Sequence, residues 1–227
     1  MIPGISAVAF DLDGTLYPNY RLNIRLIPFL LRHWRLMFAF GKARDRIRSE
    51  QKESPSSFRT DFYDYQAQLT AERLNAPQEN IGEMLERLVY RGFEHHFLHI
   101  KLFPHIRELL EELRAARIKL GLLSDFPPET KLKNLGLADG WDAVLCSEDT
   151  GALKPAVRPF VCLAEALGCR ADEVLYVGNS YRYDILGARQ AGMKAALITG
   201  WGKFGKVNTD AYFTFNNYRK LRDFVLH

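Results

Sequence analysis

The sequence predicts an α/β fold in which a parallel sheet is covered by helices. Over the second half of the chain, short apolar segments alternate with segments of helical periodicity, an order that is typical of parallel sheets. A longer helical stretch follows the first strand and indicates an inserted group of helices. With 227 residues, the chain is long enough for one large domain or for a domain that carries such an insertion.

Strands are expected where short apolar segments are bounded by turn residues. These segments are residues 7–10, 118–123, 143–146, 174–177 and 195–198, and residues 212–215 are expected to add an edge strand before a final helix. Between the strands, the spacing of apolar residues predicts helices. They lie at residues 105–116, 128–135, 158–167 and 183–191.

The helical stretch after the first strand runs from about residue 21 to residue 98, with breaks expected at Pro28, 54–57 and 75–77. Within it, residues 26–40 are apolar and aromatic but too few and too charged to span a bilayer, so no stable membrane insertion is expected. We expect this part to pack as a helix on its neighbours or on the main domain. A homodimer contact, a contact with a membrane surface, and arginines that face an anionic substrate stay open as alternatives.

Charge and cysteine content exclude some classes of protein. The chain has 31 Lys and Arg against 27 Asp and Glu, and a net charge of +4 is too small to indicate nucleic-acid binding, although a small anionic substrate is compatible with it. The three cysteines, Cys146, Cys162 and Cys169, lack metal-ligand spacing and are expected to be reduced thiols in a cytoplasmic protein. No signal peptide precedes the first strand, so secretion is not expected.

Two carboxylates, Asp11 and Asp13, follow the first strand and lead into Gly14. Side chains two residues apart on an extended chain share a face, and glycine permits the sharp turn that would bring backbone amides close to a ligand. Two neighbouring carboxylates repel each other unless a cation lies between them or one keeps its proton, and both arrangements suit a phosphate-handling site. The alternative is a strand followed by a solvated turn.

Three further polar sites lie where strands of the predicted sheet end, and ligand sites of open α/β sheets gather at the carboxyl ends of strands. Ser124 and Asp125 could hold a phosphate oxygen through the hydroxyl and backbone amides, although serine is also common at turns and caps. Lys154 precedes a proline that restricts its backbone and could lie near the carboxylates instead of in solvent. Residues 178–184 form a turn that opens a helix, where Asp184 could also be a simple cap.

These four sites, in this order, resemble the haloacid dehalogenase superfamily of phosphotransferases. The matching residues are the sequence DLDGT at 11–15, Ser124, Lys154-Pro155, and GNSYRYD at 178–184. The resemblance implies a doubly wound, Rossmann-like core domain of residues 1–16 and 100–227. It also implies that residues 17–99 form the helical cap of the first type (C1) that the phosphatase branch of this family carries.

The resemblance also assigns roles to single residues. Asp11 would attack phosphorus and form an aspartyl-phosphate, and Asp13 would be the general acid and base. Among the substrate-binding residues, Thr15 and Ser124 would position phosphate oxygens, with Asp125 beside them. Lys154 would serve both catalysis and substrate binding by offsetting the charge of the nucleophile and the phosphoryl group.

A magnesium ion is the cofactor that the resemblance implies, because an anionic nucleophile cannot easily approach a dianionic phosphate. Its ligands would be the Asp11 carboxylate, the Asp13 backbone carbonyl, Asp184 and Asn179. The family usually has aspartate where this chain has Asn179. Asparagine offers an oxygen without charge, so we expect weaker binding of the metal, with Asp184 contributing more.

The sequence therefore predicts Mg²⁺-dependent hydrolysis of a small phosphorylated metabolite, a phosphomonoester, through an aspartyl-phosphate. Dehalogenation does not call for the second aspartate, so Asp13 favours ester hydrolysis. Two alternatives remain: an attenuated or non-catalytic phosphate-binding regulatory member of the same fold, and a sugar phosphomutase.

Overall fold

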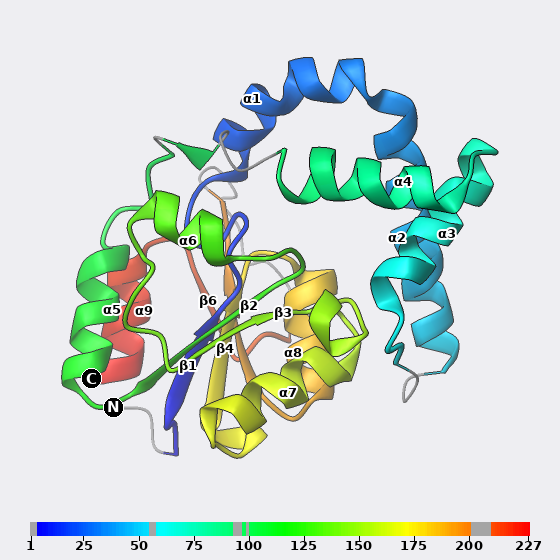
Figure 1. The fold of residues 1–227 in the computed structure, drawn as a ribbon. Coiled ribbons are helices and arrows are strands. Elements are labelled where there is room, and N and C mark those ends of the chain that lie inside the picture. The colour runs from blue at the N-terminus through cyan, green and yellow to red at the C-terminus, as the bar shows by residue number, and fades with distance from the viewer. Residues whose placement is uncertain (1–3, 55–57, 93–96, 99, 201–209) are drawn as a thin grey trace.

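The computed structural model describes residues 4–54, 58–92, 97–98, 100–200 and 210–227 (Figure 1). Six parallel strands form one sheet in the order β3-β2-β1-β4-β5-β6. Their bounds are β1 Ala7–Phe10, β2 Lys119–Ser124, β3 Ala143–Cys146, β4 Val174–Gly178, β5 Lys194–Ile198 and β6 Phe213–Phe215. The predicted α/β fold with a doubly wound parallel sheet is confirmed, and every expected strand is present to within one residue at each end.

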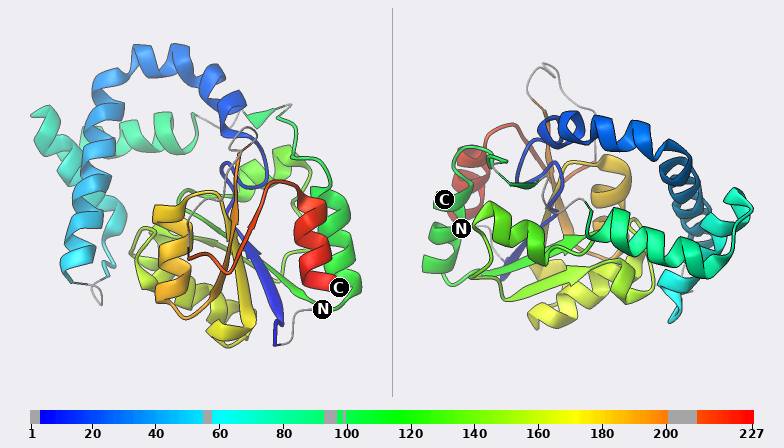
Figure 2. Two further views of the ribbon diagram at one scale, coloured as in Figure 1. Left: turned by 180° about the vertical axis from the view of Figure 1, so that it is seen from behind. Right: turned by 45° about the horizontal axis from the view of Figure 1, so that its top comes forward.

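Helices cover both faces of the sheet. Helices α5 (Ile106–Ala115) and α9 (Tyr218–Leu226) lie on one side, and α7 (Val157–Leu167) and α8 (Leu186–Gln190) lie on the other (Figures 1 and 2). Successive side chains of β1 point to opposite faces of the sheet, so they belong to two separate apolar clusters. Val8 and Phe10 belong to the apolar cluster under α5 and α9, whereas Ala7 and Ala9 belong to the cluster under α7 and α8. Burial on both faces explains why β1 is apolar throughout.

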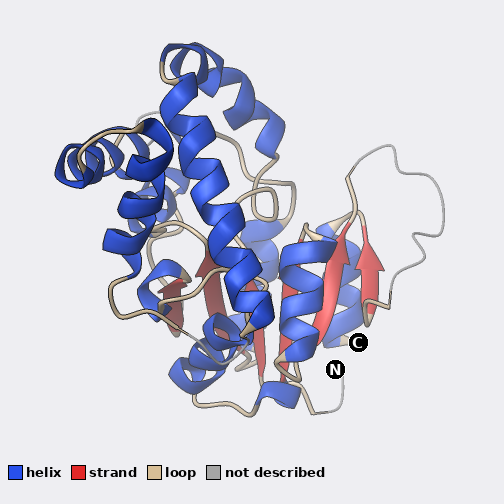
Figure 3. Ribbon diagram, turned by 90° about the vertical axis from the view of Figure 1, so that its right-hand side faces the viewer, coloured by secondary structure: helices blue, strands red, loops and turns tan. Residues whose placement is uncertain are grey.

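A group of helices between β1 and β2 stands apart from those that flank the sheet (Figures 1 and 3). It consists of α1 (Asn19–Arg32), α2 (Trp34–Glu53), α3 (Phe62–Leu74), α4 (Gln78–Leu85) and a π-helical turn, η1 (Glu86–Tyr90). It has an apolar cluster of its own, which includes Leu36, Phe40, Ile81 and Leu85. We call these elements the helical insertion.

The helical insertion differs from expectation at Pro28. A break was predicted there, but α1 continues through Pro28 to Arg32, and the chain leaves helical geometry at His33. A proline inside a helix removes a backbone hydrogen bond and costs about 3 kcal/mol. Leu22 and Leu26 are buried along the inner face of α1, and their packing offsets this cost.

The other two expected breaks are present. Helix α2 ends at Glu53, and α3 ends at Leu74, where Asn75 adopts the left-handed conformation with φ 52°. Asparagine is one of the residues that tolerate this conformation at a helix end. No helix in the described part of the chain is both long enough and apolar enough to cross a bilayer.

Candidate active site

Asp11 lies directly beyond β1, at the carboxyl end of the sheet. Its side chain is buried, with Oδ1 2.6 Å from the Lys154 Nζ and with Oδ2 accepting a hydrogen bond of 2.8 Å from the Thr15 hydroxyl. The turn that returns Thr15 to Asp11 requires Gly14, whose φ of 89° is unfavourable for residues with a side chain. The motif at 11–15 therefore forms a tight turn in which its last residue binds the carboxylate of its first.

Lys154 joins two of the predicted site residues. Its ammonium lies 2.6 Å from Asp11 and 2.8 Å from Asp184, and the Tyr176 hydroxyl is 3.3 Å away. Burial alone would lower the pKa of Lys154, but the two carboxylates outweigh burial and hold that pKa well above its ordinary value. Lys154 is therefore a fixed positive charge between two carboxylates, of which one follows β1 and the other follows β4.

One positive charge does not neutralise this cluster. The pKa of Asp11 is raised to about 7, mainly by burial, against the effect of Lys154 and with smaller contributions from the neighbouring carboxylates Asp184 and Asp13. Burial and the neighbouring carboxylates thus both disfavour the ionised form of Asp11. Additional positive charge at this point would stabilise the ionised form of Asp11.

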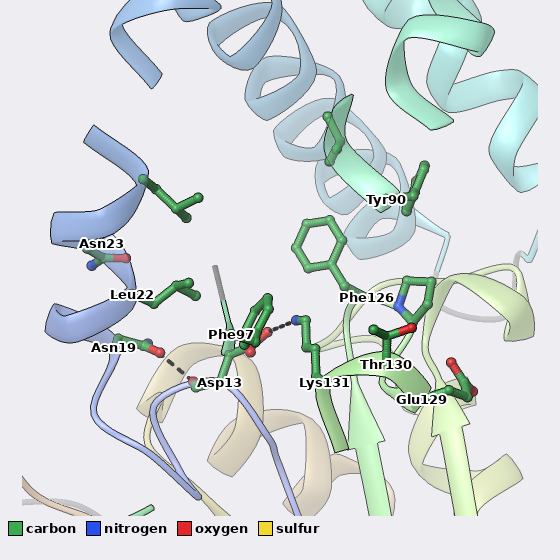
Figure 4. A pocket seen from close by; sticks show the side chains of 13 residues that line it. Asp13, Asn19, Leu22, Asn23, Tyr90, Phe97, Phe126, Glu129, Thr130 and Lys131 are labelled. Atoms are coloured by element: carbon green, nitrogen blue, oxygen red, sulfur yellow. Dashed lines mark hydrogen bonds and ion pairs between the residues drawn. The ribbon is translucent and has the colours of Figure 1, made fainter. Parts of the chain in front are cut away.

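Asp13 faces away from that cluster and into a cavity of about 230 Å³ (Figure 4). Its Oδ2 is 2.7 Å from the Lys131 Nζ, its Oδ1 accepts a hydrogen bond from the Tyr17 hydroxyl, and its backbone carbonyl accepts one of 3.2 Å from Asn19. The walls of the cavity are mainly apolar. They consist of Leu22 and Leu26 of α1, Val89 of η1, Phe97, and Phe126 and Pro127 of the loop before α6 (Glu129–Leu135), while α6 itself contributes polar residues.

The fourth motif, residues 178–184, begins at the end of β4 and continues into a π-helical turn, η5 (Tyr181–Ile185). Ser180 caps it by accepting a hydrogen bond from the Tyr183 amide, and Asp184 Oδ2 accepts one of 2.9 Å from the Ser180 amide. A Cβ at Gly178 would lie 2.3 Å from that of Asp184, so glycine is required for this carboxylate to reach Lys154. Asp184 thus caps the turn and also faces the site.

Asn179 is exposed, and its side-chain amide lies against Gly14 on the outer side of the first turn. It is therefore next to the first motif, as the resemblance implies, while Asp184 is the buried carboxylate of the fourth motif. Ser124, at the end of β2, is buried, and its hydroxyl accepts a hydrogen bond of 3.2 Å from the Phe126 amide.

The Asp125 carboxylate is used in a way that the sequence did not predict. Arg48 of α2 lies 2.8 Å from its Oδ2, Arg44 lies 3.6 Å away, and the Lys154 backbone amide donates to Oδ1 at 3.2 Å. Burial would raise the pKa of Asp125, but these positive neighbours lower it below the ordinary value. The carboxylate binds the helical insertion to the loop that carries Lys154, which we call the lysine loop. Only the backbone amide of Asp125 is left for the predicted substrate contact.

Sequence reasoning missed several residues that contact the predicted ones. Lys131 and Tyr17 bind Asp13, Tyr176 contacts Lys154, and Arg48 binds Asp125. The contact of Tyr17 could have been considered from the sequence, because Tyr17 lies only four residues after Asp13, in the turn that follows the first strand. The other contacts could not, because they join segments far apart in the sequence.

The donor set fits the implied magnesium ion. Mg²⁺ binds oxygen and usually takes one or two carboxylates while it keeps several waters. Asp11 and Asp184 supply two carboxylates around one point, with Lys154 as their shared positive charge, so a divalent cation finds oxygen ligands of opposite charge there. The described residues contain no group of three or more His, Cys, Asp or Glu side chains that could hold a metal by themselves.

A family model for haloacid dehalogenase-like hydrolases matches residues 5–192, a span that contains every site residue described above. The chain belongs to the haloacid dehalogenase-like hydrolases. The resemblance inferred from four short motifs is thereby confirmed, and the protein is an enzyme of the hydrolase class.

Curated relatives within the haloacid dehalogenase-like hydrolases are named as phosphatases. A glyceraldehyde 3-phosphate phosphatase of Methanocaldococcus jannaschii is 27% identical over 97% of both chains. A phosphoglycolate phosphatase of Yersinia pseudotuberculosis is 28% identical over 89% of this chain and 84% of the relative. A ribulose-1,5-bisphosphate 5-phosphatase of Halopiger xanaduensis is 30% identical over 85% and 84%.

Solved structures of haloacid dehalogenase-like hydrolases share the fold over almost the whole length. A phosphatase of the family from Thermococcus onnurineus superimposes with a TM-score of 0.64, at 29% identity and with 97% of this chain and 98% of that one covered. The L-2-haloacid dehalogenase RSc1362 gives a TM-score of 0.65 at 21% identity, with 98% and 99% covered, and this likeness concerns the fold alone.

Proposed function

We propose that the chain is a Mg²⁺-dependent phosphatase that hydrolyses a small phosphomonoester through an aspartyl-phosphate on Asp11. The observation that carries this proposal is the position of Asp11, which is buried, 2.6 Å from the Lys154 ammonium and two residues from a second carboxylate that faces a cavity. Relatives named as phosphatases of small phosphate esters support the reaction class.

In the first step, an Asp11 carboxylate oxygen attacks phosphorus, and the bond between phosphorus and the ester oxygen breaks. Two unit charges 4 Å apart repel by about 4 kcal/mol at an effective dielectric constant of 20, so the approach of two anions needs compensation. Lys154 supplies one positive charge and also fixes the orientation of Asp11. Thr15, which donates to the other oxygen of Asp11, and Ser124 are suited to hold phosphate oxygens. A bound Mg²⁺ would supply further positive charge and orient the phosphate.

Asp13 is the proposed general acid and base. The contact with Lys131 favours the ionised form of Asp13, so Asp13 must take up a proton when the substrate binds. It gives this proton to the leaving alkoxide, which departs as an alcohol into the cavity beside it. Asp13 then takes a proton from a water molecule, whose oxygen attacks phosphorus. The bond between phosphorus and Asp11 breaks, inorganic phosphate is released, and both aspartates return to their starting states.

We assign residues 17–99, which contain the helical insertion, the role of a cap over a core of residues 1–16 and 100–227. Supporting this, the cavity beside Asp13 has walls from both parts, with Leu22 and Leu26 on one side and Phe126 on the other. A cap of this kind excludes water from the site and determines which alcohol fits. The volume of about 230 Å³ fits a small alcohol.

The test is phosphate release from p-nitrophenyl phosphate and a panel of small phosphomonoesters, with and without Mg²⁺. Native protein is compared with Asp11→Asn and with Asp139→Asn, a matched change at an exposed aspartate of the core. Activity that needs Mg²⁺, is lost in Asp11→Asn and persists in Asp139→Asn is the expected result. Native protein that is inert at all Mg²⁺ concentrations would overturn the phosphatase. Isomerisation of a sugar phosphate without phosphate release would instead identify a mutase.

A further inference from the structure

Helices α1 and α2 of the helical insertion carry several large exposed apolar side chains. On α1, Tyr20, Ile24, Ile27 and Leu31 are spaced four, three and four residues apart and so share one helix face. On α2, Trp34 and Phe38 extend the set past the turn at His33. Ile24, Leu31 and Trp34 are 62%, 72% and 63% exposed. We call these six apolar residues the outer face.

The six residues of the outer face do not belong to the apolar clusters of the described structure. The opposite side of α1 already carries the buried residues Leu22 and Leu26, which join the core and line the cavity beside Asp13. Large side chains of α2 such as Leu36 and Phe40 are likewise buried on its inner side. An exposed apolar patch of this extent is typical of a surface that contacts a partner.

Charge identifies the kind of partner. Residues 14–44 contain no Asp or Glu but six Lys and Arg, so this stretch is basic although the whole chain is only mildly so. Arg44 is buried in an ion pair with Glu148 and Lys42 is paired with Asp45, so neither is counted toward the charge of the outer face. Arg32 and Arg35, next to Leu31 and Trp34, are exposed, and neither forms an ion pair with another described residue. The partner must therefore combine an apolar layer with a negatively charged surface.

A second copy of the chain lacks this complementarity. In a two-fold symmetric dimer the same patch lies on both sides of the interface, so the arginines of one copy would meet those of the other. An anionic phospholipid bilayer offers what the patch needs, because its headgroups carry negative charge and its acyl layer accepts apolar side chains. A helix face with Trp, Ile and Leu, flanked by arginines, is characteristic of helices that lie in the membrane interface.

We propose that the outer face docks on the surface of an anionic phospholipid bilayer. The helix lies on the membrane and does not cross it, in agreement with the lengths of the described helices. Because the other side of α1 lines the cavity beside Asp13, docking places that cavity one helix diameter from the lipid surface. This inference rests on the surface of α1 and α2 and is independent of the proposed phosphatase reaction.

The experiment measures sedimentation of the full chain with vesicles. Vesicles of phosphatidylcholine that contain about 30% phosphatidylglycerol are compared with vesicles of pure phosphatidylcholine, each at low and at high salt. We expect at least tenfold tighter binding to the anionic vesicles at low salt, with most of this preference lost at high salt because screening weakens the arginine contacts. Native protein that stays in the supernatant with anionic vesicles at low salt would overturn the proposal.

Two variants locate the contact. Leu31→Glu places an acidic group in the outer face, and Val161→Glu makes the same change at a partly exposed apolar residue on α7, on the far side of the sheet domain (Figure 1). We expect Leu31→Glu to bind at least tenfold more weakly and Val161→Glu to bind like the native chain. Thermal unfolding of each variant shows whether it is folded.

Trp34 gives a second measurement. Its indole is exposed in the free chain, so anionic vesicles should shift the tryptophan emission to shorter wavelength in native protein and not in Trp34→Phe. Equal binding of native protein and Leu31→Glu would overturn the assignment of the outer face. A dimer in solution that dissociates on the Leu31→Glu change would also overturn it, since a second copy would then cover the patch.

Discussion

Lys131 and Asp13 form an ion pair at the edge of the cavity, with the lysine Nζ 2.7 Å from Oδ2 of the aspartate (Figure 4). The ammonium is largely buried and lies 5.0 Å from the centre of the Phe97 ring and 5.4 Å from that of Phe126. A cation in such surroundings interacts strongly with any anion that enters. Because it touches the proposed proton donor, Lys131 lies within reach of groups attached close to the ester oxygen of a substrate.

We therefore expect Lys131 to favour phosphomonoesters with a carboxylate next to the ester oxygen. Native enzyme should have a higher kcat/KM for 2-phosphoglycolate than for ethyl phosphate, which has the same length but no carboxylate. In the Lys131→Met variant, the ratio of kcat/KM for 2-phosphoglycolate to kcat/KM for ethyl phosphate should be about tenfold lower, which corresponds to about 1.4 kcal/mol. Lys133→Met, an exposed lysine of the same helix, is the control. An unchanged ratio in Lys131→Met would contradict this role even if the phosphatase itself were established.

A second prediction concerns Lys154. Replacing it with methionine leaves Asp11 and Asp184 buried side by side without their shared cation. Removal of one partner of a buried ion pair typically costs 3–5 kcal/mol, so we expect Lys154→Met to be destabilised by roughly 3 kcal/mol in urea unfolding. Mg²⁺ should restore part of this loss, because it would supply the missing positive charge.

The double variant Lys154→Met with Asp11→Asn is the control for this interpretation. Removing one carboxylate relieves the repulsion, so the double variant should be more stable than Lys154→Met alone. If the double variant instead loses as much stability as the two single variants together, repulsion between Asp11 and Asp184 does not cause the destabilisation of Lys154→Met.

The sequence predicted part of the cluster around Asp11. Parallel strands carry their following loops to one edge of the sheet, so Asp11 and Asp184 could be expected near each other, and Ser124 at the same edge, once the strands are recognised. The positions of Lys131 and Arg48 could not be predicted, because they depend on how α6 and the helical insertion pack above that edge. Helical periodicity indicates which side of a helix is buried but not which segment it is buried against.

Arg48 provides the third prediction. It donates to Asp125 at 2.8 Å and to the Lys154 carbonyl at 3.0 Å, so one side chain of the helical insertion fixes both the loop after β2 and the lysine loop. We expect Arg48→Met to raise KM severalfold and to lower the free energy of unfolding by about 1–3 kcal/mol. Arg46→Met, an exposed arginine of the same helix with surface ion pairs only, should change both quantities little.

Substitution of Arg48 by lysine separates charge from geometry. A lysine keeps the positive charge but cannot donate to two acceptors in the fixed arrangement of a guanidinium group. We expect Arg48→Lys to recover less than half of the stability that Arg48→Met loses. Full recovery would mean that charge alone holds the helical insertion against the core.

The last prediction concerns the buried pair of Glu148 and Arg44, which joins the core to α2. Burial raises the pKa of Glu148 from 4.5 to about 7, although Arg44 favours the charged form. Between these pH values the folded protein keeps a proton that the unfolded chain has released. The contribution of Glu148 to stability is therefore fully present below pH 4.5 and is lost as the pH rises to about 7.

Glu148→Gln removes this titration, so its free energy of unfolding should fall less steeply than that of native protein between pH 5 and 7. The difference in slope should approach 1 kcal/mol per pH unit, close to the limit of about 1.4 kcal/mol for one proton. Urea unfolding across that range measures it, and Asp149→Asn, at the exposed neighbouring residue, should keep the native slope. Asp11, whose pKa is also raised, contributes to the slope in the same direction in native protein and in both variants. If Glu148→Gln leaves the slope of the free energy of unfolding unchanged, the pH dependence comes from Asp11 and not from the contact between Glu148 and Arg44.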